Sequence, residues 1–312
     1  MTKDGKTTEI LDIADELLAQ GRHGEAIAVL EELETALSGE EQVLLRLAWA
    51  SWDHGDKERS IRYWETILDR ELQRKVFTGF AYDELVRIYK QESQIEKLVT
   101  LCEKATGVQP LDIGLLEELG GAYLLAGQNE KACGIFRKLV SMDGDNPAFH
   151  CRLGEALMAA GKPLQCEEAF RQAGLIDPDE AVRYLFLLAD LYGKRGNYPA
   201  AKHWLGKCLE ADPANSLYLC AMGDILIALE QFHDALASYE KAVQCDTIRA
   251  AVYYNRLGHS FMKAGHFLRA VSAFEKAVSI DENGPCMLGL NAARKALEST
   301  HQKNSTGLKE NN

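Results

Sequence analysis

Residue types that could carry chemistry are present in the chain, but they are not grouped in a catalytic pattern. Five of the eight histidines stand singly between residues 150 and 266: His150, His203, His233, His259 and His266. Catalysis requires a nucleophile, a base or a metal held in one pocket. The sequence has no glycine-rich phosphate loop, no nucleophile elbow and no HExxH motif. We therefore expect no enzymatic activity and no cofactor.

The cysteines indicate free thiols rather than a disulfide or metal framework. The chain has eight of them, without a CxxC pair or a Cys/His group at metal-ligand spacing. No apolar run of signal-peptide length occurs at the N-terminus, because Asp12, Asp15 and Glu16 interrupt it. No stretch approaches the roughly 20 apolar residues of a membrane span. We expect a cytoplasmic protein with reduced cysteines, no metal and no direct membrane insertion.

The charge of the chain argues against nucleic acid or an anionic membrane as the main partner. The formal net charge is -12. Through Asp112 there are 23 acidic against 14 basic residues, or -9, and the remainder has 24 against 21, or -3. An acidic surface of this kind repels phosphate groups. The alternative is that the acidic surface only keeps the protein soluble and indicates no partner.

The elements that would position functional residues are helices arranged in repeats. Good helix formers dominate the composition and only seven prolines occur, which favours an all-α fold. Self-comparison of the sequence shows one small residue per repeat, at spacings of 34, 35, 34 and 35: Gly120, Gly154, Ala189, Gly223 and Gly258. Large aromatic residues recur in the same frame: Phe136, Phe170, Tyr239 and Phe274.

In this pattern the chain resembles the tetratricopeptide-repeat (TPR) family over roughly residues 7–281. Eight repeats begin near Thr7, Glu41, Gly79, Ile113, Pro147, Val182, Ser216 and Ala251. The resemblance implies an α-solenoid, a right-handed superhelix of antiparallel helix pairs. We expect residues 1–6 to be a flexible N-terminus, 7–284 the eight repeats, 285–299 a C-terminal capping helix and 300–312 a disordered tail.

The physical reason for the pattern is close helix packing. Glycine in a helix interior costs about 1 kcal/mol relative to alanine, which is tolerable where a neighbouring helix must approach closely. The aromatic side chains would fill the space opposite. The second and third repeats are 38 residues apart, around Asp69 to Phe77. This insertion either lengthens a helix by about one turn or bends the stack.

The resemblance also implies a binding surface. In TPR proteins the first helix of each pair lines a concave groove, and the residues one, four, eight and eleven positions after each repeat start face it. In the N-terminal half this frame selects Leu18, Trp49, Trp52, Phe80, Arg87 and Lys90. Trp and Arg are enriched at interface hot spots. The alternative is that the tryptophans only fill space in an irregular repeat.

In the C-terminal half the same frame selects an acidic ladder with apolar neighbours. The ladder is Glu155, Asp190 and Asp224, one per repeat. The neighbours are Met158, Phe186, Leu217, Cys220, Ile227, Val252, Asn255, His259 and Met262. Such a surface would complement a basic or apolar partner segment. The alternative is a solvated acidic stripe without a ligand. We expect Asp190→Lys with Asp224→Lys to abolish partner binding and to leave helicity and melting unchanged.

These observations favour a non-catalytic scaffold or adaptor that binds another protein in its groove. One alternative is a peptide-sensing regulator whose superhelix changes on binding. Sensors of that type use groove asparagines, and only Asn255 lies in the expected groove. Another alternative is a non-catalytic subunit of a larger enzyme machine. A clamp for acidic chaperone tails is disfavoured, because its basic slots are occupied by Asp and Glu in the C-terminal half.

Overall fold

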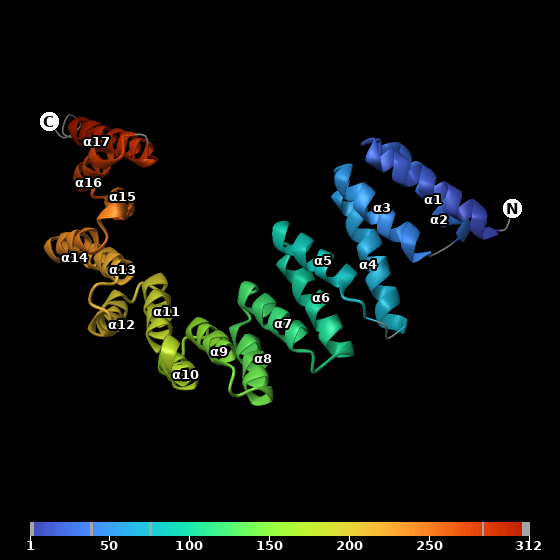
Figure 1. The fold of residues 1–312 in the computed structure, drawn as a ribbon, viewed down its shortest axis with the longest axis horizontal. Coiled ribbons are helices and arrows are strands. Elements are labelled where there is room, and N and C mark those ends of the chain that lie inside the picture. The colour runs from blue at the N-terminus through green and yellow to red at the C-terminus, as the bar shows by residue number, and fades with distance from the viewer. Residues whose placement is uncertain (1–2, 38–39, 75–76, 283, 308–312) are drawn as a thin grey trace. The chain divides into compact units, whose positions relative to one another are not determined.

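The computed structural model describes residues 3–37, 40–74, 77–282 and 284–307 of the 312-residue chain. Within these ranges the regular elements are all helices, and they follow one another as pairs (Figure 1). The all-α fold of antiparallel helix pairs is therefore confirmed. The chain divides into two compact units, Met1–Met142 and Asp143–Asn312. Each unit is described by itself below.

The first unit contains four helix pairs. Its helices are α1 (Lys3–Ala19), α2 (His23–Leu37), α3 (Glu41–Asp53), α4 (Lys57–Arg74), α5 (Phe80–Gln91), α6 (Ile95–Val108), α7 (Ile113–Leu125) and α8 (Asn129–Met142). Helix α4 has 18 residues, whereas α6 and α8 have 14 each. The insertion between the second and third repeats thus lengthens α4 by about one turn.

The second unit contains four more pairs and a final helix. Its elements are α9 (Pro147–Ala159), α10 (Pro163–Ile176), η1 (Pro178–Glu180), α11 (Ala181–Lys194), α12 (Tyr198–Ala211), α13 (Ser216–Ala228), α14 (Phe232–Cys245), η2 (Thr247–Arg249), α15 (Ala250–Lys263), α16 (Phe267–Ile280) and α17 (Cys286–Gly307). From α3 onward, the first helix of each pair begins within one residue of the repeat start expected from the sequence.

Both ends of the described chain are more helical than expected. Helix α1 already begins at Lys3, within the segment expected to be flexible. Helix α17 continues to Gly307, eight residues beyond the expected end of the capping helix. The hydroxyls of Ser299 and Thr300 donate to carbonyls four residues earlier, so they do not interrupt the helix. Residues 308–312 of the expected tail lie outside the described ranges.

Local capping sets where helices begin and end. The Asn146 side chain accepts the backbone N–H of Ala148, and Pro147 occupies the first helical position, where it needs no donor. At the other end of α9, Gly161 has φ 74°, a left-handed conformation that glycine adopts without strain. The following N–H, of Lys162, then donates to Leu157 O at 2.9 Å. These contacts close the turn between the two helices of the pair.

Close packing between the helices of a pair explains the recurring small residues. A Cβ atom placed on Gly154 would lie 2.6 Å from the ring of Phe170, which is buried. The same relation holds at 2.6 Å or less for three other pairs: Gly120 with Phe136, Gly223 with Tyr239, and Gly258 with Phe274. The backbone of the first helix therefore rests directly on the aromatic ring of the second, as the sequence pattern predicts.

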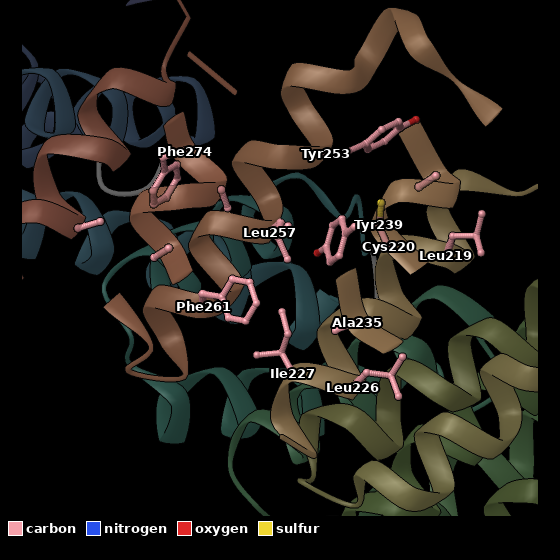
Figure 2. Close-up of a cluster of buried hydrophobic side chains, with 14 of the residues drawn as sticks. Leu219, Cys220, Leu226, Ile227, Ala235, Tyr239, Tyr253, Leu257, Phe261 and Phe274 are labelled. Carbon is pink, nitrogen blue, oxygen red and sulfur yellow. The ribbon is translucent and has the colours of Figure 1, made fainter. Parts of the chain in front are cut away.

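The core of the second unit continues from one repeat into the next. Tyr239, Leu257, Phe261 and Phe274 belong to one buried cluster drawn from α13 to α16 (Figure 2). Leu290 and Ala293 of α17 join the same cluster. A Cβ atom on Gly289 of α17 would lie 2.5 Å from the ring of Phe274. Helix α17 therefore packs on the last repeat and covers apolar surface of that core.

Burial makes most of the cysteines chemically inert. All eight are free, seven are buried, and Cys245 is exposed. Burial raises the pKa of Cys166 to about 12 and that of Cys151 to about 11. The neutral thiols contribute stability that is complete below pH about 9 and is lost as pH rises toward 12.

We predict that iodoacetamide at pH about 8 modifies Cys245 alone in the folded chain, because thiolates are the reactive species. Mass spectrometry of peptides from the native and the denatured protein would measure this. Denaturation should expose all eight thiols. Modification of Cys166 or Cys208 at the rate of Cys245 would contradict the packing described here.

Candidate protein-interaction surface

The first helices of three successive repeats in the second unit enclose a hollow. Its volume is about 620 Å³, and α11, α13 and α15 supply most of its lining. Small residues line much of it: Ala189, Gly193, Ala221, Ala228 and Ala264. Phe186 and Ile225 add apolar surface. A concave, mainly apolar space of this size is typical of binding sites in proteins.

Ion pairs are fixed in the lining of the hollow. Asp190 Oδ2 lies 2.6 Å from Lys194 Nζ, one turn along α11. Asp224 Oδ2 lies 2.7 Å from Arg256 Nη2, which comes from α15. Lys263 and Glu230 also line the hollow. The lining thus contains three carboxylates and three Lys or Arg side chains, and the hollow carries no excess of one sign.

Asp224 connects three helices. Its carboxylate accepts hydrogen bonds from Arg256 of α15 at 2.9 Å (Nε) and 2.7 Å (Nη2), and from the hydroxyls of Tyr239 in α14 and Ser260 in α15. Burial and then the Asp224 carboxylate raise the pKa of the Tyr239 hydroxyl far above its usual range. Only 28% of the Asp224 side chain is exposed. This residue is therefore part of the packing as well as of the hollow.

An aromatic cluster lies on the first unit. The Trp64 ring of α4 is fully buried, and the rings of Trp49 and Phe80 pack against it with centroids 5.4 and 5.7 Å away. Trp49 and Phe80 are 36% and 49% exposed, and their own centroids are 6.5 Å apart. Two exposed aromatic side chains from α3 and α5 thus form one continuous surface, which we call the aromatic patch.

The basic residues near the aromatic patch are already engaged. Arg87 lies over the Trp52 ring, 5.0 Å from its centroid, and pairs with Glu84 at 2.7 Å. Lys90 pairs with Glu118 at 2.6 Å. Each of these two cations is therefore already neutralised by a carboxylate, and Arg87 also contacts an indole ring.

Comparison with known proteins identifies the family. Three tetratricopeptide-repeat models match residues 11–72, residues 123–191, and residues 182–215, 217–246 and 251–283. The chain belongs to the tetratricopeptide-repeat family. The small residues and aromatic knobs of its helix pairs are the packing positions of this TPR array.

Two relatives are subunits of one named complex. The BBSome complex member BBS4 homolog of Drosophila melanogaster is 24% identical over an alignment 262 residues long, which covers 68% of this chain and 53% of the relative. BBSome complex member BBS4 of Bos taurus is 25% identical over 179 residues, 57% of this chain and 34% of the relative. The TPR chain thus spans about half of the first relative's length and about a third of the second's.

A solved structure shares the fold. The tetratricopeptide repeat protein from Parabacteroides merdae is 18% identical, with a TM-score of 0.51 over 81% of this chain and 98% of that protein. At this identity the likeness concerns the TPR fold alone.

The structure brings together part of the surface expected from the TPR frame. Four of the expected residues line the hollow: Phe186, Asp190, Asp224 and Ile227. Leu217 and Val252 are exposed at 50% and 59% on the neighbouring α13 and α15. Their side chains are free to contact a partner.

Several expected groove residues are packed into the core, and Ile227 is among them although it also lines the hollow. Met158, Cys220 and Ile227 are only 6%, 1% and 2% exposed. Ile227 belongs to the buried cluster that contains Phe261, so it packs against the next repeat. Met262 packs partly against the same cluster, and Leu18 packs partly against a core cluster of α1 to α3. These side chains therefore pack beneath the expected surface, where a partner would not contact most of their area.

The remaining expected residues of the second unit belong to α9 and α15 and do not line the hollow. His259 is exposed and its ring lies 5.0 Å from that of Phe274. Asn255 is half-buried, and within the described chain its Oδ1 atom has no hydrogen-bond partner. Glu155 pairs with Arg152 at 2.7 Å. Each of the three carboxylates of the expected acidic ladder thus has a cation of its own.

The sequence analysis missed residues that shape the hollow. Gly193 stands eleven positions after the sixth repeat start, so the TPR frame itself could have selected it. Lys194 pairs with Asp190 at a helical spacing of four, which the sequence also contains. Arg256 lies 32 positions from Asp224, and no local pattern joins these two residues.

The described residues give no sign of other site types. Among them, no three His, Cys, Asp or Glu side chains are grouped so that they could hold a metal ion. The helices in the described ranges include none with the length and apolar character needed to cross a membrane.

Proposed function

We propose that this TPR protein is a non-catalytic scaffold or adaptor that holds a segment of a partner protein in the hollow of its second unit. The observation that carries the proposal is the hollow itself, a space of about 620 Å³ with small side chains in much of its lining. Such a lining leaves room for large apolar side chains of a partner. Because Asp190 and Asp224 of the hollow are paired with cations, apolar contact supplies the affinity for the partner. The ion pairs select the orientation of the bound segment.

A test of this proposal is to fill the hollow. Ala221 of α13 lines it, and Ala237 is an exposed residue of α14 outside it. We predict that Ala221→Trp lowers partner recovery at least about tenfold, which corresponds to about 1.4 kcal/mol. Ala237→Trp should leave recovery unchanged. The measurement is quantitative affinity purification from the native cell with mass spectrometry, and both variants must melt as the parent does.

Partner recovery that is unchanged by Ala221→Trp would contradict binding in the hollow. Recovery that falls by the same factor with Ala221→Trp and Ala237→Trp would contradict it as well, because the effect would then not be specific to the hollow.

A second candidate function is that of a subunit in a larger assembly. The similarity to two BBSome complex members favours it, since those relatives are named as parts of a complex. A subunit of this kind would co-elute with its partners as one species of fixed composition. An adaptor would instead exchange between free and bound forms. Size-exclusion chromatography of native extract distinguishes the two. The cytoplasm remains the expected compartment for either function.

A further inference from the structure

The aromatic patch of the first unit is exposed over part of its surface, and packing within the unit does not require that exposed part. Trp49 and Phe80 leave 36% and 49% of their surface in solvent, although they come from two helices and lie side by side. Adjacent exposed aromatic side chains are uncommon on a free protein surface and are frequent at interfaces. Trp64, fully buried beneath both, fixes their positions.

The backbone holds Phe80 in this position. Phe80 is the first residue of α5, and Gly79 before it has φ 85°, which a side chain would strain. The N–H of Phe80 donates to the hydroxyl of Thr78 at 3.4 Å. The patch is therefore preorganised by the glycine turn before α5, which lowers the entropy cost of binding.

An acidic group stands one turn from Phe80 on the same helix. Asp83 is exposed, and within the described residues it forms no ion pair. Its neighbours Glu84 and Glu118 are paired with Arg87 and Lys90. Burial and then these two carboxylates raise the pKa of Asp83 above its ordinary value. Asp83 thus has no cation of its own within the described residues.

We propose that the aromatic patch and Asp83 form a second docking site, for a partner segment that carries a Lys or Arg next to an aromatic or large aliphatic side chain. The apolar side chain would lie on Trp49 and Phe80, and the cation would pair with Asp83. Charge complementarity supports this occupant, because unit 1 carries 26 acidic and 17 basic residues, a net charge of -9. The inference uses no residue of the hollow in the second unit.

The experiment is a selection of random peptides by phage display on the full chain. We expect enriched peptides that combine a basic residue with an aromatic or aliphatic one. The best of them are then synthesised and titrated into the protein, with affinity measured by fluorescence anisotropy. Phe80→Ala and Asp83→Lys should each weaken binding about tenfold or more. Added salt should weaken binding as well.

The matched control is Glu58→Lys. Glu58 is an exposed acidic residue in the first turn of α4, as Asp83 is in the first turn of α5. Its reversal changes the net charge by the same amount and should leave affinity within about twofold of the parent. Thermal melting of each variant shows whether the fold is kept. If Phe80→Ala melts at a lower temperature than the parent, the binding of Asp83→Lys, a substitution at an exposed site, tests the inference instead.

Three outcomes would overturn the inference: no enriched peptide, enrichment of acidic peptides, or affinity that neither Phe80→Ala nor Asp83→Lys changes. Equal weakening by Glu58→Lys and Asp83→Lys would also overturn it, since only net charge would then matter. Peptides lost with Ala221→Trp and retained with Phe80→Ala belong to the hollow. If only such peptides are found, the proposed function is supported and the second site is not.

Discussion

Replacing Phe170 by alanine is expected to lower the free energy of unfolding by about 3–5 kcal/mol. The Phe170 ring is 2% exposed and lies directly on the backbone of Gly154 in the partner helix. Its removal leaves a cavity between two helices that no other side chain reaches to fill. Leu164→Ala, in the same helix at a site 78% exposed, should change stability by less than about 0.5 kcal/mol. Denaturant unfolding followed by circular dichroism measures both.

A double-mutant cycle shows whether the ring and the glycine act together. Gly154→Ala alone should cost about 1–3 kcal/mol, because its Cβ would lie 2.6 Å from the ring. In the Phe170→Ala background the same substitution should cost much less, or stabilise the helix. Additive costs would contradict the packing of small residue against aromatic ring.

Reversing the charge of Asp224 is the second change with a large expected effect. Asp224→Lys removes the acceptor of Arg256, Tyr239 and Ser260 and places a cation beside Arg256. Breaking a buried pair costs about 3–5 kcal/mol. Since Arg256 is 40% exposed, we expect about 2–4 kcal/mol here. The melting temperature of Asp224→Lys should therefore be clearly lower than that of the parent.

Asp190→Lys provides the comparison. Asp190 is 46% exposed, and within the described residues it forms an ion pair with Lys194 only. Reversing its charge should therefore lower the free energy of unfolding by less than about 1 kcal/mol. An unchanged melting curve for Asp224→Lys would contradict its role between α13, α14 and α15. For the double reversal, the contacts of Asp224 lead us to expect a lower melting temperature, whereas the sequence alone predicts an unchanged one.

The fold could be predicted from the sequence because its determinants are local and repeated. Gly154 and Phe170 belong to one helix pair and lie 16 positions apart, so the same spacing in each repeat reports the same contact. Helix starts follow from capping residues such as Asn146 and Pro147. The helical end at Gly307 was not predicted, since a polar composition does not distinguish an exposed helix from a disordered tail.

The candidate site was predicted only in part, because its electrostatics depend on contacts between repeats. The TPR frame places Asp190 and Asp224 on one surface, but the cation that neutralises Asp224 comes from α15. Ile227, which the frame assigns to the groove, lines the hollow and also packs into the core of the next repeat. Periodicity locates a helix face to within a residue or so, and the boundary between groove and core depends on side-chain packing.

The most direct measurement of where a partner binds is site-specific photo-crosslinking. Lys263 of α15 lines the hollow, and Lys276 of α16 is an exposed lysine of the second helix in the same repeat. A photoreactive residue at position 263 should form a covalent adduct with the partner, and one at position 276 should not. Adducts from position 276 alone, or equal yields from both, would contradict binding in the hollow.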